Sequence, residues 1–275
     1  MGVDTQRRPH GVSAQPHRGD PSADVSARLV GVGVGPGDPE LLTVKAVRVL
    51  QTADVVLVPV LDLDDDEPGR AEASVRAHLG DDARVRRVRF ALNDRAGLSE
   101  TRTNSWDAAA RTVLQCWDEG GASVVAFATI GDPSVYSTFS YLAQTVSALR
   151  PDAQVEVVPG VTAMQDLAAR SVTPLCEGTE SLALFPMTAG LDRFAQALDV
   201  FDTVVGYKGG RQLPGMLDVV RRAGRLDTAV FGAALGLAEE TVRPAGEMSG
   251  DRVTQAPYLS TLLVPPARRG RGGRL

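Results

Sequence analysis

The stretch LVGVGVGPGDPELLTVKAV, Leu29 to Val47, decides the fold that we expect for this chain. Its first residues are apolar or β-branched with interleaved glycine, which predicts a buried strand. Gly35 to Pro39 then breaks the strand, and Asp38 and Pro39 suit the cap and the first position of a helix. Leu41 to Leu50 carries apolar residues at helical spacing. The stretch therefore predicts a strand, a glycine-rich turn and a helix, an arrangement that commonly binds a ligand in α/β proteins.

Two common nucleotide-binding motifs do not fit this turn. The dinucleotide fingerprint needs a third glycine five residues after the first, but Pro36 stands at that distance from Gly31 and Asp38 from Gly33. No Gly-Lys-Ser/Thr follows, so the turn is not a P-loop. An acidic side chain at the start of the helix would also repel a pyrophosphate. A nicotinamide-dependent oxidoreductase remains an alternative that these residues argue against.

Three further stretches follow the same order of strand, turn and helix. They are ATIGDPSVYSTFSYL (Ala128 to Leu142), VVPGVTAMQDLAAR (Val157 to Arg170) and GYKGGRQLPGMLDVVRRAG (Gly206 to Gly224). A last predicted strand ends at Leu235 and Gly236. Because apolar strands alternate with amphipathic helices along the whole chain, we expect an α/β fold with buried strands.

Composition bounds the class of ligand. The 275 residues suffice for one large domain or two ordinary ones, and the net charge of −5 argues against general affinity for nucleic acid. An anionic ligand must therefore meet locally placed arginine and lysine. Cys116 and Cys176 have no zinc or CxxC spacing, and two of the three histidines lie near the N-terminus, so no metal site is predicted.

The chain ends and one internal segment set the expected organisation. Residues 1–27 and 266–275 are poor in bulky apolar side chains, and we expect two disordered tails, the second one basic. Leu149 to Ala153 reads as a linker between domains at 28–150 and 151–265. No apolar run reaches membrane-spanning length and no signal peptide is evident, so a cytoplasmic location is predicted.

The four stretches together resemble the tetrapyrrole methylase family, whose members transfer a methyl group from S-adenosylmethionine. The family pattern Gly-x-Gly-Pro-Gly-Asp-Pro-x-x-Leu-Thr-x-x-Ala is similar to Gly33–Ala46, and Gly131-Asp132-Pro133 and Pro159–Ala163 also fit. The resemblance extends over roughly Arg28 to Pro265. It implies two α/β domains with the cofactor in the cleft between them, no metal, and a homodimer.

The resemblance also implies a substrate and a set of site residues. Tyr136 to Thr138 and the Lys208 to Arg211 turn resemble the branch that methylates precorrin-2, an anionic tetrapyrrole, at C20 to give precorrin-3A on the route to cobalamin. Lys208, Arg211 and Arg102 are expected to pair with its carboxylates, and Arg95 is a further candidate. Asp132 and Tyr136 are candidates for the base that removes the C20 proton. The implied cofactor-binding residues are Pro36, Gly37, Ile130, Gly131, Asp132, Val135, Thr162, Ala163, Tyr207, Lys208, Ala234 and Leu235.

Several alternatives stay open at this point. The same fold also methylates other tetrapyrroles, such as cobalt-precorrins and uroporphyrinogen III, and ribosomal RNA, although the acidic charge argues against RNA. A non-catalytic module that binds an S-adenosyl ligand would have the same glycine-rich turns, so this alternative also stays open. Asp132, in turn, could serve only as the cap of the next helix.

Overall fold

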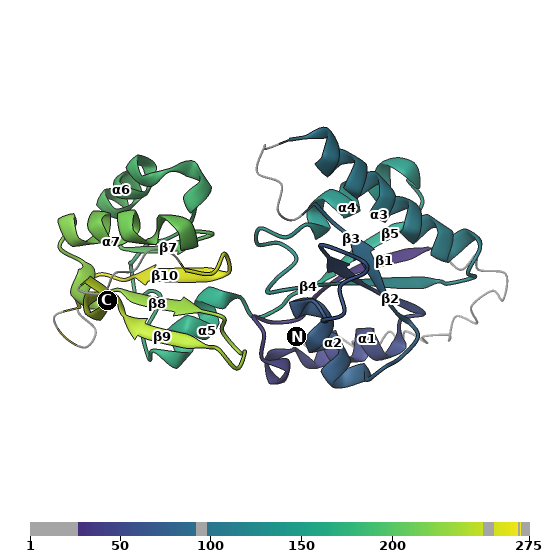
Figure 1. The fold of residues 1–275 in the computed structure, drawn as a ribbon, viewed down its shortest axis with the longest axis horizontal. Coiled ribbons are helices and arrows are strands. Elements are labelled where there is room, and N and C mark those ends of the chain that lie inside the picture. Colours follow the sequence, from purple (N-terminus) through teal and green to yellow (C-terminus); the bar gives the residue numbers. More distant parts are fainter. Residues whose placement is uncertain (1–26, 92–97, 250–255, 269, 271–275) are drawn as a thin grey trace, which may run out of the picture.

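The computed structural model describes residues 27–91, 98–249, 256–268 and 270. Two lobes lie side by side, and each is built on a five-stranded sheet with helices on both faces (Figure 1). This arrangement confirms the expected α/β fold class. Within the described ranges, no helix has both the length and the apolar character needed to cross a bilayer.

The first sheet is entirely parallel and has the strand order β3-β2-β4-β1-β5. Helices α3 and α4 pack on one face through a cluster that includes Phe127 and Trp117. Helices α1 and α2 cover the other face, where Val32 and Leu50 are fully buried. Burial on both faces explains why these strands read as continuous apolar runs. The elements are β1 (Arg28–Gly33), α1 (Val44–Thr52), β2 (Val55–Val60), α2 (Arg70–Leu79), β3 (Val85–Arg89), α3 (Glu100–Asp118), β4 (Val124–Thr129), α4 (Phe139–Leu149) and β5 (Gln154–Val158).

The position of β5 corrects one expectation about the organisation. We assigned residues 151–265 to the second domain and Leu149 to Ala153 to the linker, but β5 pairs in parallel with β1 along its whole length. The segment before it is therefore the short connection between α4 and an edge strand of the first sheet. The chain leaves this sheet only after Val158, so we refer to residues 28–158 as the first half.

The second sheet is mixed and has the order β6-β7-β10-β8-β9. β6 and β7 are parallel, whereas β10 runs antiparallel to both of its neighbours, β7 and β8. Helices α6 and α7 cover one face and α5 the other (Figure 1). The elements are α5 (Ala163–Arg170), β6 (Leu182–Pro186), α6 (Leu191–Val200), β7 (Thr203–Tyr207), α7 (Leu213–Arg222), β8 (Val230–Ala233), β9 (Thr241–Pro244) and β10 (Ser260–Val264), with short 3-10 helices at Pro39–Leu41, Met187–Ala189, Gly210–Gln212, Leu226–Thr228 and Ala245–Ser249.

The opening stretch folds largely as expected, with one change at the helix start. Asp38 does act as a cap, but its side chain accepts a hydrogen bond from Glu40 N at the head of a single 3-10 turn. The α-helix begins later, at Val44, where Thr43 Oγ1 accepts from Ala46 N at 3.1 Å. Asp38 and Thr43 are both good caps, and the sequence alone did not reveal that the chain uses both in succession.

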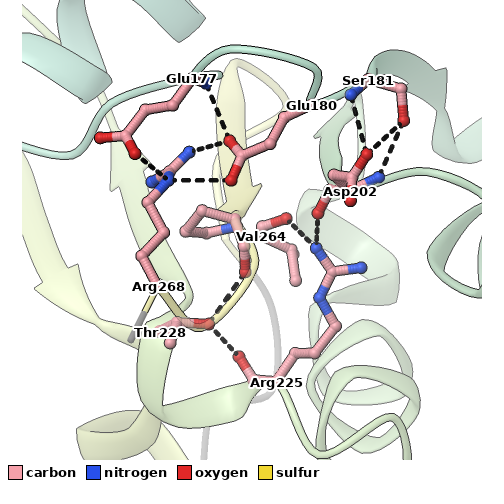
Figure 2. A network of polar contacts seen from close by, with 9 residues as sticks. Glu177, Glu180, Ser181, Asp202, Arg225, Thr228, Val264 and Arg268 are labelled. Carbon is pink, nitrogen blue, oxygen red and sulfur yellow. Dashed lines mark hydrogen bonds and ion pairs between the residues drawn. The ribbon is translucent and has the colours of Figure 1, made fainter. Parts of the chain in front are cut away.

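A polar network holds the chain after β10 against the second half (Figure 2). Arg225 donates to the carbonyl oxygens of Val264, at 2.8 Å, and Asp202, while Thr228 Oγ1 donates to Pro265 O. Arg268 pairs with the fully buried carboxylate of Glu180 at 2.6 Å.

Arg268 therefore corrects our expectation for residues 266–275, because it lies in a segment that we expected to begin a disordered tail. A buried carboxylate needs a countercharge, and the guanidinium of Arg268 supplies it.

Candidate functional site

Three glycines form the floor of the site at the carboxyl ends of β1, β4 and β5. A Cβ on Gly33 would lie 2.6 Å from Gly131 O and from Gly160 N, so only glycine allows the three backbones to meet there. Gly131 N donates to Gly35 O at 2.8 Å, which joins the first two glycine-rich turns directly. The repeated glycine turns of the sequence are thus parts of one structure, at the sheet edge where parallel α/β folds bind ligands.

Asp132 lies on this floor and organises its backbone. Oδ1 accepts from Ser134 N at 2.7 Å, and Oδ2 accepts from Gly160 N at 2.9 Å. Both carboxylate oxygens are therefore engaged by backbone groups of neighbouring turns. This geometry favours a role in holding the turns together over the role of a free base. The suggestion that Asp132 caps the next helix is wrong, because α4 begins at Phe139 and Thr138 occupies its N-cap position.

A cavity of about 750 Å³ extends from this floor between the two halves. The second half contributes residues from the start of α5, the end of β7 and the turn after β8. The first half contributes the turns after β1 and β4, and also the basic side chain of Arg102 on α3. Of the residues proposed from the sequence, those that line the cavity are Pro36, Arg102, Ile130, Gly131, Asp132, Val135, Tyr136, Thr162, Ala163, Tyr207, Lys208 and Leu235.

Three of the proposed residues lie elsewhere. Gly37 and Ala234 are not among the described residues that line the cavity; a Cβ on Gly37 would overlap the carbonyl oxygen of Leu235. Gly37 therefore forms part of a close contact between the two halves. Arg211 is exposed on a 3-10 turn and does not line the cavity either. Arg95, the further candidate for the substrate, lies outside the described residues.

Arg170 strengthens the contact between the halves. Its guanidinium pairs with Asp166 at 2.8 Å and Glu240 at 2.9 Å, both in the second half, and with Asp38 of the opening turn at 3.7 Å. Burial is the largest influence on Asp166 and raises the pKa of its carboxyl, against the effect of the nearby guanidinium. Glu240 also accepts from Gly236 N, so the cluster fixes the turn after β8 beside Gly37.

Tyr207 and Thr162 position the cavity wall of the second half. The hydroxyl of Tyr207 accepts from Met164 N at 3.0 Å in the first turn of α5. Gln165 Oε1 accepts from both the backbone N and the hydroxyl of Thr162, which caps this helix. The sequence placed Thr162 at a helix start, and these contacts confirm it.

Tyr136 and Lys208 face each other across the cavity, and both have left-handed backbones, with φ of 51° and 61°. Such a conformation costs a non-glycine residue about 1–2 kcal/mol and is concentrated at functional sites. Lys208 Nζ lies 5.0 Å from the centre of the Tyr136 ring. Burial raises the pKa of the Tyr136 phenol. Burial, and secondarily Arg102, lowers the pKa of the Lys208 ammonium.

Sequence reasoning missed part of the cavity wall. The rings of Trp106 on α3 and Tyr141 on α4 stack with centroids 4.3 Å apart, and both line the cavity. No local signal marks this pair, because the two residues meet only when the helices pack.

The acidic loop after β2 forms another part of the wall. Asp65 and Glu67 line the cavity, and Arg87 donates to both of their backbone carbonyls. Arg87 also pairs at 2.8 Å with Glu72, a carboxylate of α2 that is fully buried and pairs with Arg76 as well. A buried charged group therefore connects α2 to this cavity loop.

Comparison with known proteins identifies the family and the fold. The sequence profile of the Tetrapyrrole (Corrin/Porphyrin) Methylases matches residues 28–248. The chain belongs to this family. A precorrin-2 C(20)-methyltransferase of Sinorhizobium sp is 33% identical over 241 residues, which cover 86% of this chain and 95% of that protein. A cobalt-precorrin-2 C(20)-methyltransferase of Salmonella typhimurium is 31% identical, with coverages of 87% and 97%.

Solved structures agree with the family at the level of the fold. A cobalamin synthesis related protein from Corynebacterium diphtheriae superposes with a TM-score of 0.67 at 21% identity, covering 88% of this chain and 100% of that one. Uroporphyrin-III C-methyl transferase from Thermus thermophilus, solved with S-adenyl homocysteine, gives 0.57 at 24% identity, covering 86% and 97%. The family that we inferred from the glycine-rich turns of the sequence is therefore confirmed.

Proposed function

We propose that this tetrapyrrole methylase transfers a methyl group from S-adenosylmethionine to C20 of precorrin-2 in cobalamin biosynthesis. The observation that carries the proposal is the identity of 31–33%, over nearly the whole chain, to two proteins named as C20-methyltransferases of this substrate class. The cavity between the halves is the candidate reaction site, because it is lined by the turns through which the family resemblance runs.

The residues of the cavity fit the cofactor. Gly131 lines it with a φ of 69°, and a Cβ there would meet only Thr162 Cα, at 4.0 Å, so a side chain would fill space that the glycine leaves open. Apolar walls from Pro36, Ile130 and Leu235 suit an adenine ring. When bound, S-adenosylmethionine supplies an electrophilic methyl group. The protein's task is then to align this group with a carbon nucleophile and to exclude water.

Basic residues on the cavity wall offer partners for an anionic macrocycle. Arg102 lies on the α3 wall, where a guanidinium can bind a carboxylate through two hydrogen bonds. The stacked Trp106 and Tyr141 rings offer an apolar surface beside it. We assign Arg102 to substrate carboxylates.

The test is to incubate the protein with precorrin-2 and S-adenosylmethionine labelled with ¹³C in the methyl group, and to locate the label by NMR. A label at C20 supports the proposal; a label at another carbon, or none, refutes it. Cobalt-precorrin-2 belongs in a parallel reaction, because the two relatives differ in this respect and are almost equally similar. Whether the protein is a cytoplasmic homodimer stays a prediction, and light scattering of the purified protein tests its dimeric state.

A further inference from the structure

We propose that Lys208 accepts the proton that leaves C20, acting as a neutral amine; this inference rests on the proposed function. C20 first forms its bond to the methyl group with an electron pair of the macrocycle, while the carbon–sulfur bond of the donor breaks. The C20–H bond then breaks, and its electron pair returns to the conjugated ring. The proton passes to Nζ of Lys208, which becomes an ammonium group and releases the proton to water between turnovers.

The two bases considered from the sequence are poorly placed for this step. Both oxygens of Asp132 accept backbone hydrogen bonds, from Ser134 and Gly160, so its carboxylate is committed to the floor of the cavity. Tyr136 accepts a proton only as a phenolate, and burial raises the pKa of its hydroxyl further from neutrality. That hydroxyl also lies 3.4 Å from the carbonyl oxygen of Leu184, which it can reach only as a donor. The proton acceptor must therefore be sought elsewhere on the cavity wall.

Lys208 is held at the cavity in a fixed orientation. It follows β7 directly, is half-buried and lines the cavity. Its backbone is left-handed, at φ 61°, a conformation that costs lysine energy and would cost glycine none. The chain has lysine at this position and glycine at the next two. The face of the Tyr136 ring then confines the side chain, with Nζ 5.0 Å from the ring centre. These restraints place an amine beside the ligand volume.

The charges around Lys208 favour loss of its proton. Arg102 faces it from α3, and the phenols of Tyr136 and Tyr207 lie beside it. The cavity carboxylates are Asp62, Asp65, Glu67 and Asp132, but within the described part of the chain none forms an ion pair with Nζ. The ring face of Tyr136 favours the ammonium form. Burial, and secondarily Arg102, act in the opposite direction and lower the pKa of Lys208.

The residue type supports the same conclusion. Only two of the 29 basic residues are lysines, Lys45 and Lys208. A guanidinium stays protonated at any physiological pH, whereas a lysine in a poorly solvated site can act as a base. The chain thus uses arginine almost throughout and places one of its two lysines on the wall of the reaction cavity.

The two lysines also make a direct test simple. Reductive ¹³C-methylation of the full-length protein gives two lysine signals, and Lys45, exposed on α1, is an internal reference. Lys45→Met assigns the signals. We expect Lys208 to titrate at a clearly lower pH than Lys45. If both lysines titrate at the same pH, the proposal is overturned, independently of any activity measurement.

Kinetics with three variants separates a base from a substrate-binding cation. We expect Lys208→Met and Lys208→Arg each to lower kcat roughly 100-fold or more, the usual contribution of a general base, with S-adenosylhomocysteine affinity within about twofold of wild type. Lys45→Met should leave kcat unchanged. In the wild type, kcat should rise with pH as the amine of Lys208 loses its proton. This rise should be absent from both Lys208 variants.

Two results would reject the base. One is Lys208→Arg with wild-type kcat, and the other is Lys208→Met with a raised KM but unchanged kcat, since both describe a cation that binds substrate. Circular dichroism melting establishes that the variants fold; methionine and arginine share the left-handed cost of lysine at this position. An inactive wild type would overturn the proposed function itself, whereas an active wild type with an active Lys208→Arg would overturn only this inference.

Discussion

Gly33→Ala is the substitution with the most direct structural consequence, because the added methyl group meets backbone on both sides. Its Cβ would lie 2.6 Å from Gly131 O and from Gly160 N, and 2.7 Å from Gly160 Cα. Ordinary contacts of this kind begin near 3.4 Å, so each neighbouring strand end must move by several tenths of an ångström. No side chain can rotate away to relieve the overlap. We expect destabilisation in the upper part of the range for overpacking, about 2–3 kcal/mol.

Thermal denaturation measures this cost. For a chain of this size, 1 kcal/mol lowers Tm by roughly 2–4 °C, so Gly33→Ala should melt about 4–12 °C below wild type. S-adenosylhomocysteine affinity should also fall, because Asp132 loses its alignment with Gly160 N. Gly246→Ala is the matched control: its Cβ would meet only ordinary contacts at 3.6 and 3.9 Å. Equal melting temperatures for the two variants would refute the argument that the three strand ends require glycine at Gly33.

Three further predictions concern charged residues. Glu72→Gln should lower the free energy of unfolding by about 1–3 kcal/mol in urea denaturation, because it leaves two partly hydrated guanidiniums without their buried carboxylate. Burial acts to raise the pKa of Glu72, but hydrogen bonds from its two arginines outweigh burial and lower it. Its contribution to stability is therefore present above the ordinary glutamate pKa and lost as pH falls through the lowered value; a pH series with the glutamine variant should lack this loss. Arg102→Met should raise KM for the tetrapyrrole roughly tenfold or more, the equivalent of about 1.5–3 kcal/mol, whereas the same change at exposed Arg211 should alter KM less than twofold; equal effects would contradict the assignment. Arg170→Met should lower Tm by several degrees, since it leaves Asp166 buried without its cation; an unchanged Tm would show that the cluster adds nothing.

The secondary structure could be predicted from the sequence because the signals are local. Buried parallel strands gave continuous apolar runs, and glycine, proline and the capping residues marked the turns between them. Ser99 illustrates this: serine is a common helix cap, and the hydroxyl of Ser99 accepts from Arg102 N at the start of α3.

The errors arose where distant segments decide the outcome. Local composition placed a linker before β5, but pairing with β1 determines to which sheet the strand belongs. Arg211 and Arg102 looked alike as basic candidates, and only packing brings Arg102 to the cavity while leaving Arg211 on the surface. Neither distinction is encoded within a few residues of the side chain concerned.

The strained pair across the cavity shows why contact between the halves matters to the chemistry. Tyr136 belongs to the first half and Lys208 to the second, and their contact exists only while the two sheets keep their relative position. Gly37 against Leu235 and the Arg170 cluster are the close contacts that fix this position. A substitution in the Arg170 cluster touches no cavity atom, yet it loosens the geometry in which the amine meets the substrate. Its effect on kcat should therefore exceed its effect on S-adenosylhomocysteine affinity, which depends mainly on the glycine floor.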